Sequence, residues 1–181
     1  MKRLISCLTV AALYWGAPAQ AADAASLDCV RSELGAGYVS SVSDQVFKAL
    51  SGGAAGLPDI PTDPVDKAVA TCTARNGWSE PAGKIARIVT LTAIVDDGVR
   101  RALPTEGIDV ATVARVYANM DETNRMGFIS DGTTRDKSAV AAAQALTAAK
   151  VDLAGNRAPH VGMLLAALAI AEFVRPRFAA L

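Results

Sequence analysis

The segment APHVGMLLAALAIAEFVRPRF, residues 158–178, contains the longest apolar run of the chain and its only histidine, His160. The apolar run from Val161 to Val174 is 14 residues long and includes Glu172, whereas a helix that spans a bilayer needs about 20 apolar residues. Large apolar residues cover most of its circumference, which is typical of a helix buried on several sides. We therefore predict the central helix of a helical bundle. A docking helix, covered by a partner protein or a bilayer surface, is the alternative.

The rest of the chain repeats apolar residues at spacings of three and four, which is the period of an α-helix. The fold class that follows is all-α: a single-domain bundle of five to six helices with Ala-rich packing over residues 22–181. Helices are expected at about 26–50, 64–76, 81–103, 110–120 and 138–153, and from Pro159 onward. Gly35 and Gly37 weaken the first of these, which is either one helix or two. Residues 51–64 combine Gly pairs with three prolines and form a linker.

Several local details can be predicted for these helices. Asp63 and Asp109 are expected as N-caps, and Asn76-Gly77 as a helix end. Between residues 119 and 136 the periodicity fades, so we expect a frayed helix end followed by a loop. Asp97 is expected to pair with Arg100 or Arg101 on a solvated face. The predicted buried stripe of the third helix consists of Ile85, Ile88, Val89, Val95 and Val99.

The first 21 residues are typical of a secretory signal peptide. A short basic start, Lys2 and Arg3, precedes the apolar segment 4–15, and Ala19-Gln20-Ala21 matches a small-x-small cleavage pattern. Cleavage there would leave 160 residues, enough for one domain with a sizeable core. We therefore expect a periplasmic or secreted protein with no transmembrane helix after signal cleavage.

Two cysteines, Cys29 and Cys72, would remain in the exported chain. An exported domain with two cysteines most often pairs them, so we predict a disulfide. Closing a loop of 43 positions stabilises a fold by up to about 4 kcal/mol in the chain-entropy model. A redox role is disfavoured because the chain has no C-x-x-C motif.

Composition and motifs argue against several function classes. Without Lys2 and Arg3, 16 basic residues face 18 acidic ones, so the chain lacks the basic surface of a nucleic-acid binder. The motifs H-E-x-x-H, G-x-S-x-G and C-x-x-C-H are missing. One histidine allows little zinc or triad chemistry, so we expect no metal and no cofactor, and we favour a binding protein over an enzyme.

The strongest hypothesis is therefore an exported protein that binds another protein of the cell envelope. It would be an accessory subunit of an envelope or secretion assembly, or a small chaperone. The charged segment 121–136, with Arg125 and Arg135, and the carboxyl-terminal residues 159–181 are the expected contact regions, and the latter could also touch a membrane surface.

Two alternatives remain open. One is a hydrolase of peptidoglycan or another glycan, with Glu33 or Glu122 as general acid and His160 as a weaker catalytic candidate. The other is a carrier of a small apolar ligand between Ala-rich helices.

Overall fold

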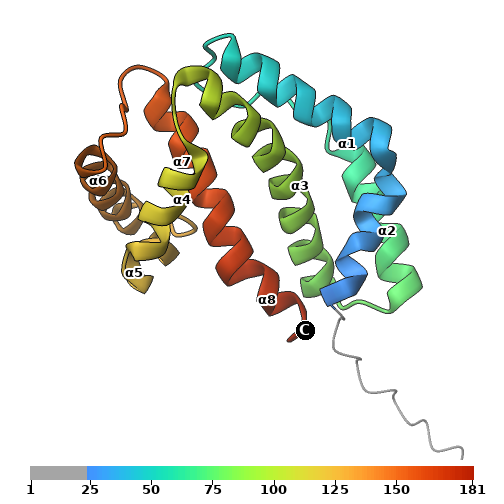
Figure 1. Cartoon of the computed structure of the whole chain (residues 1–181). Coiled ribbons are helices and arrows are strands. Elements are labelled where there is room, and N and C mark those ends of the chain that lie inside the picture. Colours follow the sequence, from blue (N-terminus) through green and yellow to red (C-terminus); the bar gives the residue numbers. More distant parts are fainter. Residues whose placement is uncertain (1–23) are drawn as a thin grey trace, which may run out of the picture.

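The computed structural model describes residues 24–181, and the predicted signal peptide lies outside them. This part of the chain is all-α, as predicted, and has no strands (Figure 1). Six helices have ten or more residues, in agreement with the predicted number. The elements are η1 (Ala24–Leu27), α1 (Asp28–Ser51), α2 (Asp63–Asn76), α3 (Glu80–Ala102), η2 (Leu103–Glu106), α4 (Val110–Asn119), α5 (Glu122–Gly127), α6 (Thr133–Ala148), α7 (Arg157–Ala169), the π-helical turn η3 (Ile170–Val174) and α8 (Arg175–Phe178).

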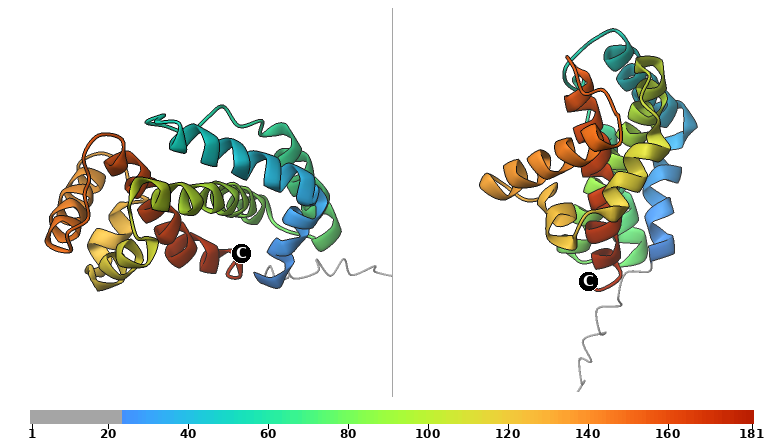
Figure 2. Two further views of the ribbon diagram at one scale, coloured as in Figure 1. Left: turned by 45° about the horizontal axis from the view of Figure 1, so that its top comes forward. Right: turned by 60° about the vertical axis from the view of Figure 1, so that its left-hand side comes forward.

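The helices form two groups on either side of a central rod. Helices α1, α2 and α3 pack against one another, and α4, α5 and α6 form the second group. The rod consists of α7, η3 and α8 and lies beside α3 (Figure 1). Helix α6 packs on α5 and α4 and projects away from the rod, as the right-hand view of Figure 2 shows. The largest core therefore lies where the rod meets α3 and α4.

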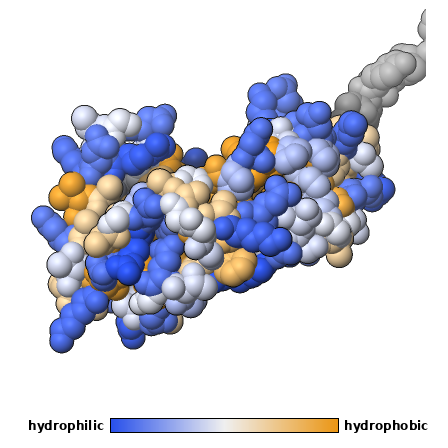
Figure 3. Space-filling model, turned by 90° about the horizontal axis from the view of Figure 1, so that it is seen from above, coloured by the Kyte–Doolittle hydropathy of each residue, from blue (hydrophilic) through white to orange (hydrophobic). Residues whose placement is uncertain are grey.

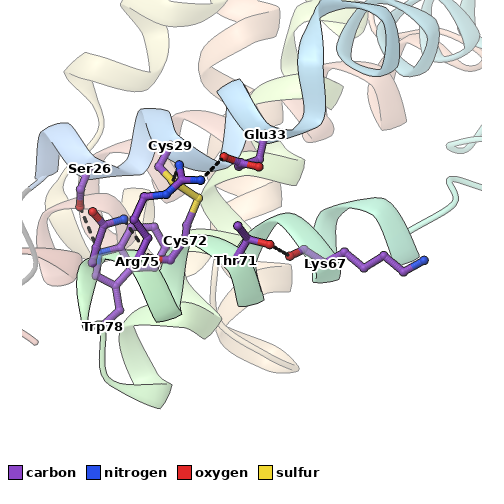
Figure 4. Close-up of a disulfide and its surroundings, with 9 residues drawn as sticks. Ser26, Cys29, Glu33, Lys67, Thr71, Cys72, Arg75 and Trp78 are labelled. Atoms are coloured by element: carbon purple, nitrogen blue, oxygen red, sulfur yellow. Dashed lines mark hydrogen bonds and ion pairs between the residues drawn. A yellow bond between two sulfur atoms is a disulfide. The ribbon is translucent and has the colours of Figure 1, made fainter.

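A disulfide joins α1 to α2 through Cys29 and Cys72, which confirms the predicted pair (Figure 4). Beside it, Trp78 donates a hydrogen bond from its indole N–H to the Ser26 hydroxyl over 3.1 Å. The Trp78 ring also meets Phe178 edge to face, with 5.0 Å between ring centroids. Because Phe178 is fully buried, this cluster ties the end of the rod to the start of the described chain.

The face that α3 presents to α1 differs from the predicted stripe. Of the five apolar residues in that stripe, Val99 alone is fully buried, and Ile88 is 43% exposed. Helix α1 packs against small residues instead: a Cβ on Gly98 would lie 2.7 Å from the Ser43 carbonyl oxygen. The close approach of α1 therefore requires small side chains on this face of α3. One row of α3, at every fourth position, is buried throughout: Ala82, Ala86, Thr90, Ile94, Gly98 and Ala102.

Helix boundaries agree with several local predictions. Asp109 caps α4, with its carboxylate accepting from the backbone N–H groups of Ala111 and Thr112. Gly77 ends α2 in a left-handed conformation. Gly35, at φ 71°, kinks α1 in the weak region that the sequence indicates.

Other boundaries correct the predictions. Asp63 is the first helical residue of α2 and not its cap. The expected frayed segment contains a separate short helix, α5, because the Asp121 carboxylate accepts from the Asn124 backbone N–H and starts a new turn. Helix α6 begins and ends about five residues earlier than expected. Its end lies at Ala148, and Lys150 follows with φ 63°.

The rod is longer than the apolar run suggested. Pro159 lies in its first turn, and Pro176 is accommodated just after η3. In the π turn the N–H of Arg175 bonds to the Ile170 carbonyl, one residue farther back than in an α-helix. Residues 157–178 thus form one helical segment of 22 residues, within which an 18-residue window has a mean hydropathy of 1.4. Among the described helices it alone is long and apolar enough to cross a membrane, a test that core helices of soluble proteins also pass.

Candidate functional site: an apolar groove along α7

One face of α7 is not covered by the other described elements and forms the floor of a groove. Three adjoining hollows of about 340, 620 and 320 Å³ share lining residues along this face, from Ala158 to Val174. Helix α3 forms one wall, and α6 with the turn before it forms the other. The rod is thus central, as predicted, but it is buried on one side and open on the other.

The walls of the groove carry exposed hydrophobic side chains. Among residues 25–181, four large hydrophobic side chains are exposed: Leu57, Ile88, Val140 and Leu181. The first three line the groove, with exposures of 45%, 43% and 58%. Seen from above in Figure 3, patches of hydrophobic surface lie between hydrophilic edges. Exposed apolar side chains that gather in one concavity mark a binding surface more often than scattered ones do.

The floor of the groove is built from small residues. Ala158, Gly162 and Ala166 follow at intervals of four and therefore lie on one side of the helix. A Cβ on Gly162 would meet nothing within 4 Å. The space above the middle of α7 is thus open, and another backbone could approach it closely, since helix separation depends on the side chains at the contact.

The linker between α1 and α2 flanks the groove on the α3 side. Leu57, Ile60 and Thr62 line the 340 Å³ hollow together with residues of α3 and α7. One end of this linker is held where the Tyr38 hydroxyl donates to the Pro61 carbonyl over 2.5 Å. The predicted linker is therefore an ordered loop that contributes to the site.

The other end of the loop is held by the start of α7. The Asn156 side-chain amide donates to the Gly53 carbonyl, and Nε2 of His160 lies 2.7 Å from the Ala54 carbonyl oxygen. Nδ1 of His160 lies 2.6 Å from Oε1 of Glu106 in η2. His160 is fully buried, so its ring joins the loop, η2 and α7 inside the molecule. His160, the weaker catalytic candidate of the sequence analysis, thus lies in the interior with both ring nitrogens engaged by the protein.

The far end of the groove is stabilised by a second polar cluster. The Tyr117 hydroxyl donates to Oε2 of Glu172 over 2.7 Å, and Arg125 pairs with Oε1 of the same carboxylate over 3.0 Å. Arg125 also donates to the Met120 carbonyl. Burial and then the Glu172 carboxylate raise the pKa of Tyr117. This cluster fixes η3, whose residues Ile170 and Val174 line the groove.

The two predicted arginines of the contact segment differ in their surroundings. Arg125 is engaged within the protein, and its side chain is only 21% exposed. Arg135 is 55% exposed, donates from Nε to the Ser130 carbonyl over 2.9 Å and pairs loosely with Asp131. Among the described residues that line any of the three hollows, Arg135 is the one charged residue, and it lines the 620 Å³ hollow.

The predicted catalytic carboxylates do not come together. Glu33 lies on α1 and pairs with Arg75 of α2 over 2.7 Å beside the disulfide (Figure 4). Glu122 lies exposed in the first turn of α5, in the other group of helices. Neither lines the groove. Within residues 24–181, no group of three or more His, Cys, Asp or Glu side chains is arranged to hold a metal ion.

The acidic pair on α3 is structural, but the predicted pairing is wrong. Arg100 bonds to Asp96 over 2.6 Å, one turn earlier on the same helix. Asp97 accepts instead from the buried Ser43 hydroxyl over 2.5 Å. Arg101 reaches across to Asp44 of α1. The cause is the close packing of α1 on α3, which brings Ser43 and Asp44 within reach of α3.

Comparison with protein-family models, with curated protein sequences and with solved structures finds no significant match to this chain. The groove itself is therefore the basis for a functional argument.

Proposed function

We propose that this protein acts after export, in the periplasm or outside the cell, by binding an amphipathic α-helix of another envelope protein in the α7 groove. It would serve as an accessory subunit of an envelope or secretion assembly or as a small chaperone. The observation that carries this proposal is that three exposed hydrophobic side chains gather around an open floor of small residues. The signal-peptide pattern and the disulfide support an oxidising compartment.

The dimensions of the groove favour a helix as the occupant. Its floor extends from Ala158 to Val174, which corresponds to about 24 Å at 1.5 Å per residue. A partner helix of about four turns fits this length, and grooves of this kind take the apolar face of an amphipathic helix. The floor is open along its length and is not an enclosed cavity, which favours a macromolecular segment over a small carried ligand.

The charges around the groove suggest the composition of that helix. Arg135 stands on the α6 wall, and the rest of the lining is uncharged and almost entirely apolar. An acidic side chain at the edge of the partner's apolar stripe would pair with this guanidinium. The partner helix is thus expected to have apolar residues at spacings of three and four, and an acidic residue beside them.

The experiment is affinity recovery of the tagged protein from its own host after mild cross-linking, with mass spectrometry of the recovered proteins. The test variant is Gly162→Leu, which fills the groove floor without meeting any atom within 4 Å of the new Cβ. The control is Gly37→Leu on α1, where a Cβ also meets nothing within 4 Å and which does not line the groove. Both changes replace glycine by a better helix former, so neither should unfold the protein.

We expect one stoichiometric partner with the wild type and with Gly37→Leu, and a loss of about tenfold or more with Gly162→Leu, which corresponds to a loss of about 1.4 kcal/mol in binding free energy. Equal recovery with all three chains would exclude the groove as the binding site. A wild-type chain that returns with a small apolar molecule and no protein would overturn the proposal in favour of a carrier.

A further inference from the structure

The hydrogen bonds of His160 define how many protons its site holds. The Ala54 carbonyl oxygen can only accept, so Nε2 of His160 must carry a hydrogen and donate it. Nδ1 faces Oε1 of Glu106 at 2.6 Å. A hydrogen must lie between these two atoms as well, either on the ring or on the carboxyl group. The observed geometry therefore needs one proton more than a neutral imidazole beside an ionised carboxylate.

Loss of that proton makes the two contacts incompatible. A neutral ring has one N–H, which goes either to Ala54 or to Glu106. The bond to an ionised carboxylate is the stronger of the two, because a charged acceptor strengthens a hydrogen bond. The hydrogen then resides on Nδ1, and the Nε2 lone pair faces the Ala54 carbonyl oxygen. Two acceptors at 2.7 Å repel each other, so the loop loses its contact with His160.

From this we infer that His160 and Glu106 form a proton-dependent latch that tightens the loop 52–62 against the groove when protonated and loosens it when the proton leaves to solvent. The loop is held near Ala54 by α7 and near Pro61 by Tyr38. Between these points it carries Leu57 and Ile60 into the wall of the 340 Å³ hollow. The Asn156 amide still holds Gly53, and the Ala54 N–H still bonds to the Ala49 carbonyl, so loss of the His160 contact loosens this part of the wall without freeing the start of the loop. The regulatory meaning of the latch rests on the proposed binding function, whereas the latch itself does not.

Glu106 is the ionisable group in contact with the His160 ring, so the two side chains together determine how many protons the site holds. Its Oε1 contacts the ring, and its Oε2 is buried without a hydrogen-bond partner. Among the described residues, the ring is therefore the one hydrogen-bond partner of this carboxylate. The elements around the ring carry further charged residues. These are Lys48 in α1, Asp59 in the loop, Arg100 and Arg101 in α3, and Asp152 and Arg157, which pair with each other.

The test uses NMR of the free protein, purified without a histidine tag. His160 is the single histidine of the chain, so its imidazole nitrogens give one unambiguous set of signals. As the pH is raised from acidic to alkaline values, we expect the Nε2-bound hydrogen to be replaced by an Nδ1-bound one. The methyl signals of Leu57 and Ile60 should shift over the same pH range. Protection of the loop amides from hydrogen exchange, corrected for intrinsic rates, should fall by about tenfold.

The variant Glu106→Gln distinguishes a latch from a passive contact. Its side-chain amide can donate to Nδ1 while the neutral ring donates from Nε2 to Ala54, so both contacts persist without an ionisable proton. The loop should then stay closed over the whole pH range, with protection changing by less than about twofold. His160→Asn, which cannot make both contacts, should leave the loop loosened at every pH.

An Nε2-bound hydrogen that persists in the wild type to alkaline pH, with unchanged Leu57 and Ile60 methyl signals, would overturn the latch. A loop in Glu106→Gln that opens with pH as in the wild type would do the same. Neither result bears on the groove, because the measurement contains no partner. Conversely, equal partner recovery with Gly162→Leu would remove the binding function and leave the latch intact.

Discussion

The hydroxyl group of Tyr117 in α4 donates a hydrogen bond to the carboxylate of Glu172 in the π turn, over 2.7 Å. This contact joins residues 55 positions apart and fixes the part of the rod that follows the groove floor. Arg125 binds the same carboxylate, so α4, α5 and η3 are held by one acidic group. The part of the rod that borders the open face is thus held in place by polar contacts of Glu172 with α4 and α5.

Alkaline pH should weaken the fold through Tyr117. Its raised pKa means that the folded protein keeps the phenolic proton at pH values where the unfolded chain loses it, above about 10. The stabilising contribution is therefore present below about pH 10 and declines as the pH rises beyond that value. Urea unfolding at increasing pH should show a steeper loss of stability for the wild type than for Tyr117→Phe. Parallel losses would mean that another group titrates.

At neutral pH the same variant, Tyr117→Phe, should be less stable by about 1 kcal/mol, the typical contribution of one hydrogen bond. The decrease is modest because Arg125 continues to pair with Glu172. Urea unfolding at pH 7 measures it. No change in the unfolding midpoint would show that water replaces the hydroxyl without cost.

Replacing glycine by alanine should have opposite effects on stability at Gly98 and at Gly162. A Cβ at Gly98 would lie 2.7 Å from both the Ser43 carbonyl oxygen and the Val46 Cβ, so Gly98→Ala should destabilise the packing of α1 on α3 by about 2 kcal/mol. Gly162→Ala meets open space and should stabilise α7 by up to about 1 kcal/mol. Thermal unfolding of both variants gives the comparison. A loss of stability in Gly162→Ala would indicate that the groove floor is already covered.

The two arginines of segment 121–136 should separate stability from binding. Arg125→Ala removes the pairing with Glu172 and the bond to the Met120 carbonyl, and should lower stability by about 1 kcal/mol. Arg135→Ala removes an exposed side chain and should change stability by less than about 0.5 kcal/mol. Partner recovery should fall with Arg135→Ala, since this side chain lines the groove. Undiminished recovery would remove Arg135 from the interface.

Removal of the disulfide should destabilise the fold without changing its helix content. For a cysteine separation of 43, the double variant Cys29→Ala, Cys72→Ala is expected to lose about 2–4 kcal/mol. Denaturant titration followed by Trp78 fluorescence measures the loss close to the missing bond. The matched control is the wild type in a reducing agent, which should lose a similar amount. Full stability after reduction would show that packing around Trp78 and Phe178 alone holds this end of the rod.

The sequence identified a substantial part of the candidate site. The stretch 158–178 with His160, the loop 51–64 and Arg135 all contribute to the groove or its border. What it missed is Glu106, the Ala54 carbonyl and the openness above Gly162. His160 and Glu106 are 54 residues apart, and a backbone carbonyl has no signature in the sequence, so neither contact could be predicted from local patterns.

The sequence by itself determined the helical class, the disulfide and many helix ends, because these follow from periodicity, from the number of cysteines and from caps such as Asp109 and Gly77. Only the tertiary structure decided which apolar face is buried. Helix α1 can approach α3 closely only along the row that contains Gly98, and so Ile88 faces the groove in place of the core. Periodicity shows that a helix has an apolar side, but the fit between two backbones decides which side the protein covers and which it leaves exposed.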